Sequence, residues 1–229
     1  IEMIHKIDSF LMNPNGTNKF PYTAFDTETN GLRLWVASVI GFSFSVDSNM
    51  GFYLPLVEWI PDETSLKTRT INKVKYEVFE HGHFKCVWNG KIYDEFFKPH
   101  EYECPEWLAP ILERWFSKTN LIMHNAPFDV NHVFTLTGVD LKDALFLDTA
   151  LLAHIINENS PNAVKEVAKE WKHELGLDPN EAANPEQIDL TKSLIKHGGH
   201  VPKGGKAQAS WRASHEQQGK ADPADTFLT

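Results

Sequence analysis

Cysteine is scarce in this chain, and long apolar runs are missing. Only two cysteines, Cys86 and Cys104, occur among the 229 residues, so the sequence holds no disulfide framework and we expect free thiols in an intracellular, reducing compartment. No apolar segment approaches the ~20 residues that a membrane-spanning helix needs, and we expect no membrane partner. The N-terminus also lacks the charged and apolar regions of a secretory signal.

Positive charge is in short supply as well. Lys and Arg total 22 against 31 Asp and Glu, which gives a formal net charge of −9. A domain that grips duplex nucleic acid through bulk electrostatics normally carries a basic face, and this composition disfavours one. An acidic chain can still be a nuclease, because carboxylates that hold metal ions add negative charge and a strand terminus can be bound by a few local contacts.

The length and the apolar pattern predict one α/β domain. We expect residues 1–229 to form a single domain, and the missing initiator Met indicates a fragment or a processed chain. Apolar and β-branched runs predict an antiparallel meander of three strands, at residues 22–25, 35–44 and 51–56. Helical spacing of apolar residues then predicts a series of helices, separated by short strands, at residues 105–115, 130–137, 150–156 and 163–175.

Two segments stand apart from this α/β pattern. Alternating apolar residues and the turn signal Asn89-Gly90 predict a β-hairpin-rich insertion at about residues 60–104. Residues 197–209 are rich in Gly and Lys and predict a mobile loop. The main basic cluster of the chain surrounds this loop and consists of Lys192, Lys196, Lys203, Lys206 and Arg212. Contact with a phosphate backbone and a solvated loop without a partner explain this cluster equally well.

The most informative segment is Phe25–Leu32, with the sequence FDTETNGL. It places two carboxylates, Asp26 and Glu28, on either side of one residue at the end of a predicted strand. Residues at i and i+2 of a strand project from the same face, so both side chains can present oxygens to one hard divalent cation. A solvent-facing strand end, where paired acids are harmless, explains this segment on its own equally well.

The segment Asp26–Leu32 resembles the first motif of the DEDD superfamily of 3′-5′ exonucleases, which includes the proofreading domains of DNA polymerases. The second motif of that superfamily, an Asn followed four residues later by an Asp, is similar to Asn125 and Asp129. Asp222 matches the third motif in register, with Gln218 where one branch of the superfamily carries Tyr. The other branch places a His closer to the Asp, and the chain fits neither branch cleanly.

The resemblance implies a ribonuclease-H-like fold and a site that binds two divalent cations, Mg²⁺ or Mn²⁺, through carboxylates. The implied metal ligands, which are also the catalytic carboxylates, are Asp26, Glu28, Asp129 and Asp222. Gln218 cannot ionise, but its amide can hold the attacking water, and His215 is a second candidate for that role. Asp225 is the alternative fourth ligand, because Asp222 precedes Pro223 and also fits a helix N-cap.

The resemblance also implies contacts with the terminal nucleotide of a substrate. The implied substrate-binding residues are Thr27 through its backbone N–H, Leu32 through its apolar surface, Asn125 and Phe128. Asn125 also fits a cap of the segment that follows it, and Phe128 also fits packing in the core beside the ligand that it precedes.

These expectations point to a metal-dependent 3′-5′ exonuclease that acts on single-stranded 3′ ends of DNA. The resemblance is greatest to the proofreading domain of family A DNA polymerases, and a polymerase region is then expected to follow in cis. One alternative is an RNA 3′-end exonuclease of the same superfamily, since the same carboxylates serve both substrates. Another is a catalytically weakened module that binds nucleic acid or a partner without cutting, which the missing Tyr suggests.

Overall fold

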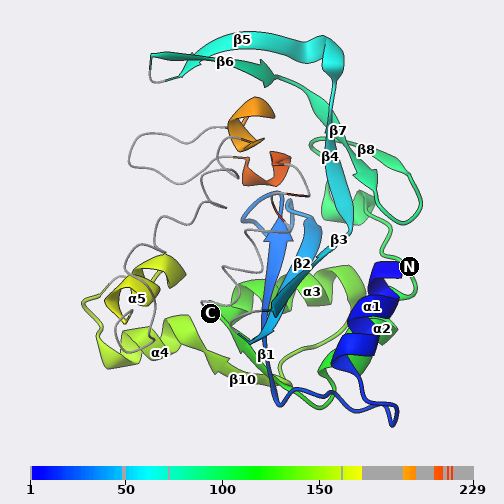
Figure 1. The fold of residues 1–229 in the computed structure, drawn as a ribbon, viewed down its shortest axis with the longest axis vertical. Coiled ribbons are helices and arrows are strands. Elements are labelled where there is room, and N and C mark those ends of the chain that lie inside the picture. Colours follow the sequence, from blue (N-terminus) through cyan, green and yellow to red (C-terminus); the bar gives the residue numbers. More distant parts are fainter. Residues whose placement is uncertain are drawn as a thin grey trace.

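The computed structural model describes residues 2–47, 50–71, 73–160, 162–171, 193–199, 209–213, 216 and 218. A five-stranded sheet forms the centre of this part, with helices packed against it and a second group of strands beyond one end (Figure 1). Among the described helices, none combines the length and the apolarity that crossing a membrane would require.

The central sheet has the strand order β10-β9-β1-β2-β3. Its strands are β1 (Tyr22–Thr29), β2 (Val39–Asp47), β3 (Met50–Pro55), β9 (Asn120–Met123) and β10 (Leu145–Asp148). The first three form an antiparallel meander, and β9 and β10 run parallel to β1. This mixed sheet with its flanking helices confirms the α/β class of a ribonuclease-H-like fold that the sequence predicts.

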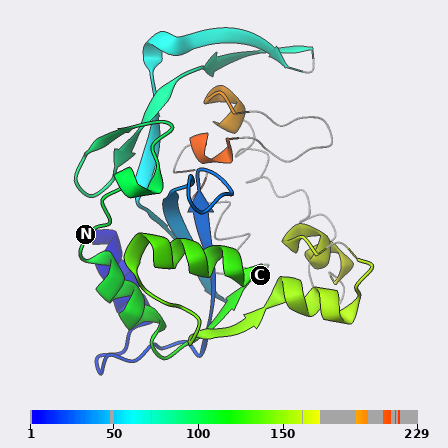
Figure 2. The same cartoon turned by 180° about the vertical axis from the view of Figure 1, so that it is seen from behind.

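Three helices pack on one face of the sheet: α1 (Glu2–Leu11), α2 (Leu108–Phe116) and α3 (Ala126–Thr137) (Figure 2). Aromatic side chains join the layers. Phe25 of β1 meets Phe116 of α2 with ring centroids 5.2 Å apart, and Phe10 of α1 meets Phe52 of β3 at 4.9 Å. The buried residues of α2 recur at helical spacing, so its apolar stripe faces the sheet. After β10 the chain continues into α4 (Thr149–Ile156) and α5 (Val164–Glu170).

Several predicted boundaries are wrong, for local reasons. Strand β2 begins at Val39 rather than at 35, because the N–H groups of Val36 and Ala37 donate to the carbonyl of Arg33 and form a turn there. Helix α3 begins at Ala126, four residues before the predicted start, and α2 begins at Leu108 rather than at 105. Helix α1 was not predicted at all. The predicted helix at 163–175 appears as α5, and residues 172–175 lie outside the described residues.

The segment expected to be rich in hairpins folds into two small sheets. Strands β4 (Val57–Pro61), β7 (Gly82–Cys86) and β8 (Ile92–Asp94) form one, and the hairpin of β5 (Leu66–Ile71) and β6 (Val74–Phe79) forms the other (Figure 1). The predicted turn lies between β7 and β8, where Gly90 has the positive φ of +70° that favours glycine.

This pair of sheets binds the chain segment that leads toward Gln218. Arg212 is only 9% exposed and donates from Nη2 to Glu95 Oε2 at 2.9 Å. Its guanidinium also lies 4.9 Å from the ring centroid of Trp59 and 5.1 Å from that of Trp211. The suggestion that Arg212 contacts a phosphate backbone is therefore wrong, because its charge is buried and paired within the fold. Most of the predicted loop at 197–209 lies outside the described residues, and Lys192 does as well.

Gly198 allows its own chain segment to pack closely against Phe79 of β6 and against Arg212. Its φ is +83°, and a Cβ at this position would lie 2.1 Å from the carbonyl oxygen of Phe79 and 2.6 Å from Nη1 of Arg212. A larger residue would thus push the segment off β6. The side chain of Arg212 completes the contact by donating to the carbonyl oxygens of Glu80 and His197.

We expect Arg212→Ala to lower the free energy of unfolding by about 3–5 kcal/mol, because it leaves the carboxylate of Glu95 buried without its partner. Arg69→Ala is the matched control, since Arg69 is 58% exposed at its side chain in its ion pair with Glu80. Urea unfolding followed by circular dichroism measures both. Equal midpoints for the two variants would contradict a stabilising role for the buried pair.

Candidate metal and active site

The candidate site lies at an edge of β1 that β9 leaves uncovered. Strand β9 pairs with β1 only from Tyr22 to Ala24, and the chain then turns into α3. Beyond that point the backbone of β1 needs other hydrogen-bond partners. The backbone N–H of Thr27 donates to Asp129 Oδ1 at 2.9 Å, and the Thr27 hydroxyl donates to the same oxygen at 2.7 Å. Asp129 on α3 thus takes the place of a strand partner.

This pairing corrects the predicted role of Thr27. Its backbone N–H was expected to face the terminal nucleotide, whereas it binds the carboxylate of Asp129 inside the protein. Thr27 is 5% exposed, which fits a role in holding that carboxylate.

Asp129 is buried beside a second acid. The residue is 1% exposed, and within the described part of the chain its Oδ2 atom has no hydrogen-bond partner. Burial, and then the negative charge of Asp26, raise the pKa of the Asp129 carboxyl well above its usual range, against the hydrogen bonds from Thr27, which lower it. Two adjacent carboxylates, one of them buried, form an arrangement that a bound cation would stabilise.

The donor set fits a hard divalent cation. Asp26 and Asp129 offer only oxygens, which favours Mg²⁺ or Mn²⁺ over softer metals. Glu28 follows Asp26 at i+2 on β1, so its side chain leaves the same face of the strand. Among the described residues, no group of three or more acidic, His or Cys side chains is already arranged around a common metal position. The predicted ligand Asp222 and its alternative Asp225 lie outside the described residues, as does His215.

Asp148 fixes the start of α3 and thereby the position of Asp129 along β1. The sequence predicted Asp148 as the N-cap of the helix that follows it, and this is confirmed, since its Oδ1 accepts from the N–H groups of Ala150 and Leu151. The same carboxylate also accepts from the N–H groups of Asn125 and Ala126, at 3.0 and 2.9 Å. One acid therefore caps two helices, and the second of these contacts was missed.

Asn125 has no capping role through its side chain. It adopts the left-handed conformation, with φ of 66°, and its side chain caps none of the described backbone groups of α3. The residue is exposed, so its amide faces solvent at the end of β9. Phe128 is half-buried and lies with its ring 4.5 Å from that of His132, which differs from the core packing considered for it.

The chain between β1 and β2, which follows the acids Asp26 and Glu28, exposes apolar side chains. Leu32 is 86% exposed and Trp35 is 74% exposed. Leu32 was predicted to offer an apolar surface, whereas Trp35 was assigned to a strand. Its position in a turn, four residues before β2, leaves an indole on the surface instead.

Gln218 is 4% exposed and has a tyrosine beside it. The hydroxyl of Tyr53, on β3, lies 3.5 Å from Gln218 Oε1. The sequence motif offered no signal for Tyr53, because this residue is far from all three motifs along the chain.

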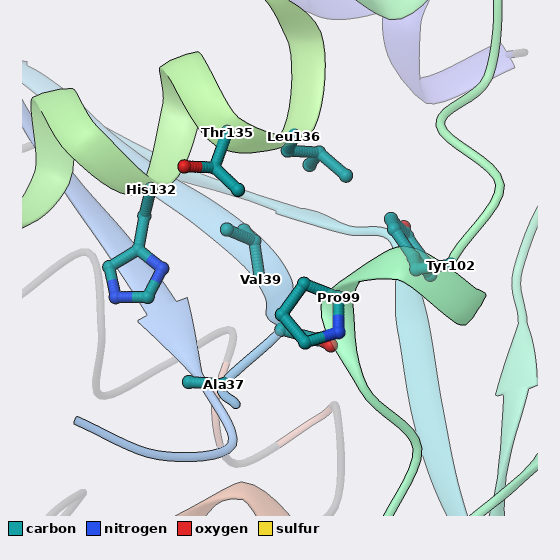
Figure 3. Close-up of a pocket in the computed structure, with 8 residues that line it drawn as sticks. Ala37, Val39, Pro99, Tyr102, His132, Thr135 and Leu136 are labelled. Atoms are coloured by element: carbon teal, nitrogen blue, oxygen red, sulfur yellow. The ribbon is translucent and has the colours of Figure 1, made fainter. Parts of the chain in front are cut away.

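A small cavity of about 50 Å³ lies apart from the acids, between α3, the start of β2 and residues 99–102 (Figure 3). Its lining includes the hydroxyls of Ser38 and Tyr102, which have no hydrogen-bond partner within the described part of the chain. None of the predicted site residues lines it, so it is distinct from the candidate metal site.

Comparisons with known proteins do not identify a family for this chain. No family model matches, and no curated protein matches the sequence. Among solved structures, the chain is similar to NrnC of Brucella melitensis with bound Mg²⁺, with a TM-score of 0.41 and 11% identity over 92% of this chain and 81% of that one. Similarity at this level assigns no activity to the chain.

Replacing Asp129 with Asn tests the electrostatics of the site. The variant keeps an oxygen for Thr27 and puts an N–H donor beside Asp26, so the chelated protein should gain about 1–2 kcal/mol of stability at neutral pH. Because folding raises the pKa of Asp129, the parent loses stability as pH rises from about 4 through the folded value, and the gain should grow over that range.

Thermal unfolding between about pH 4 and 8, first in chelator and then in Mg²⁺, measures this effect. Mg²⁺ should raise the midpoint of the parent and leave that of Asp129→Asn nearly unchanged. Asp140→Asn, at an exposed acid just after α3, is the control and should respond to Mg²⁺ like the parent. A parent indifferent to Mg²⁺ would count against the metal site.

Proposed function

We propose that this chain is a metal-dependent 3′-5′ exonuclease domain that removes nucleotides from single-stranded 3′ ends of DNA. The observation that carries the proposal is the buried Asp129 carboxylate, held by Thr27 at the edge of β1 next to Asp26. A purely structural role would not need a buried carboxylate beside a second acid. The chain order of these residues is that of the DEDD motifs.

The residues have separate tasks in this proposal. Two Mg²⁺ or Mn²⁺ ions would be held by Asp26, Glu28, Asp129 and Asp222, and would supply activation of water and stabilisation of the leaving oxygen. Thr27 orients Asp129 through two hydrogen bonds, so the carboxylate is fixed before any ion binds. Asp148 fixes the helix that carries Asp129. Buried Gln218, whose Oε1 lies 3.5 Å from the Tyr53 hydroxyl, would hold a water molecule.

The exposed apolar residues after Glu28 fit the end of a single strand. Base stacking on aromatic side chains contributes to the binding of single strands without sequence preference, and the stacking contact itself is open to an acidic chain. Leu32 and Trp35 can form such a surface, and Asn125 can donate or accept a hydrogen bond. Proofreading for a family A DNA polymerase, with residues 1–229 as one domain and the polymerase region in cis, is the biological setting that we propose.

Trp35→Ala should weaken substrate binding more than it slows chemistry. Loss of a stacking surface is worth about 1–3 kcal/mol, so KM for a single-stranded oligonucleotide should rise about 10-fold while kcat changes little. Trp35→Phe keeps a ring and should retain most of the affinity. A fall in kcat at unchanged KM would show that Trp35 acts in another way.

The activity itself is tested by digestion of a 5′-labelled single-stranded DNA oligonucleotide with Mg²⁺, with Mn²⁺ and with chelator. The parent should produce a metal-dependent ladder that shortens from the 3′ end. Asp26→Asn should lower the rate by about 10³-fold, or ~4 kcal/mol of transition-state stabilisation, while Asp140→Asn should not. A matched RNA oligonucleotide in the same assay distinguishes the related RNA exonuclease. Binding without cutting by the parent would contradict the proposal.

A further inference from the structure

Tyr53 lies on the same face of the sheet as Asp26 and Glu28 of β1. Asp26 of β1 lies opposite Ser43 of β2, and Ser43 lies opposite Tyr53 of β3. Residues directly opposite one another in an antiparallel sheet project from the same face, so the three side chains form one row across the strands. Tyr53 is 8% exposed, which is unusual for a residue near the end of an edge strand in the central sheet.

The ring of Tyr53 reaches toward Glu28 because the position between them is glycine. Gly41 of β2 lies opposite Glu28, and a Cβ on Gly41 would come within 2.6 Å of the Tyr53 hydroxyl oxygen and 2.7 Å of two ring carbons. The phenol therefore occupies the space that a side chain would fill. Since opposite Cβ atoms are about 4.5–5.5 Å apart, the Tyr53 hydroxyl lies within about 8 Å of the Glu28 Cβ atom.

The hydroxyl also meets the residue that stands where a tyrosine was expected. It lies 3.5 Å from Gln218 Oε1, and both residues are buried. On the basis of the proposed function, we propose that Tyr53 is a further catalytic residue, whose hydroxyl acts with the Gln218 amide to hold and orient the attacking water. A phenol from β3 thus supplies the group that the third motif lacks.

The chemistry requires only hydrogen bonding from Tyr53. In the hydrolysis, the water oxygen forms a bond to phosphorus and the bond from phosphorus to the 3′ oxygen of the preceding nucleotide breaks. The proton lost by the water passes to solvent, and the departing 3′ oxygen takes one up. Because the Tyr53 hydroxyl donates to Gln218 Oε1, its oxygen can accept a hydrogen bond from the water, and the amide N–H groups of Gln218 can donate to the water. Neither group changes its covalent state.

Removing the hydroxyl should slow the reaction without weakening binding. Tyr53→Phe should lower kcat on a single-stranded DNA oligonucleotide by about 10²-fold, within the range for a group that positions or transfers protons in the transition state. KM, the thermal midpoint and oligonucleotide affinity measured with Ca²⁺ in place of Mg²⁺ should stay close to those of the parent. Tyr76→Phe, on β6 and away from the central sheet, is the matched control and should cut at the parental rate.

Gly41→Ala reaches the same hydroxyl by another route. The added Cβ must displace the Tyr53 ring, so kcat should fall by about 10-fold in the parent. In the Tyr53→Phe background, where the hydroxyl is already absent, the same change should cost little more. This lack of additivity marks the two changes as acting on one group.

The outcomes separate the two proposals. Full activity of Tyr53→Phe beside an active parent would overturn the role of Tyr53 and leave the exonuclease in place. A lower thermal midpoint with unchanged kcat would also overturn it, because the bond to Gln218 would then only tether the C-terminal segment to the sheet. An inactive parent would overturn the proposed function, and the role of Tyr53 would fall with it.

Discussion

The hydrogen bonds between Thr27 and Asp129 are the interaction on which the site depends. A strand edge that is buried must find partners for its N–H groups, and β9 ends before it can supply one for Thr27. A carboxylate meets that need with two strong bonds, but it brings a charge into a buried position next to Asp26. The Thr27 N–H thereby gains a hydrogen-bond partner, and negative charge accumulates where Asp129 lies beside Asp26.

Other contacts in the structure hold Asp129 in this position. Asp148 ties the first residues of α3 to the end of β10, so Asp129 cannot move along β1 without breaking the caps of two helices. The segment that contains the two small sheets binds the chain around Arg212 through the buried ion pair of Arg212 with Glu95. Gln218 follows Arg212 by six positions, so the hairpin-rich segment holds the chain shortly before Gln218.

What the sequence could predict depended on whether the signal was local. The N-cap at Asp148 follows from a short pattern, and the proposed ligands Asp26, Glu28 and Asp129 rest on short patterns too, because each pattern involves only neighbours along the chain. The partner of the Thr27 N–H depends on where a strand about a hundred residues away stops, and no local pattern records that. The prediction for Arg212 is wrong for the same reason, since the preceding sequence is rich in Gly and Lys while its partner is 117 residues away.

Apolar periodicity failed in a different way at Trp35, because an exposed indole in a turn gives the same pattern as a strand residue. Tyr53 shows the converse case. Its place in an alternating strand is ordinary, and only the pairing of three strands, with glycine at position 41, turns its ring toward the acids. A site assembled across a sheet can therefore replace a missing motif residue from a strand that carries no motif. A motif search tests whether a group is present at its usual place in the chain, whereas the chemistry requires only that it be present in space.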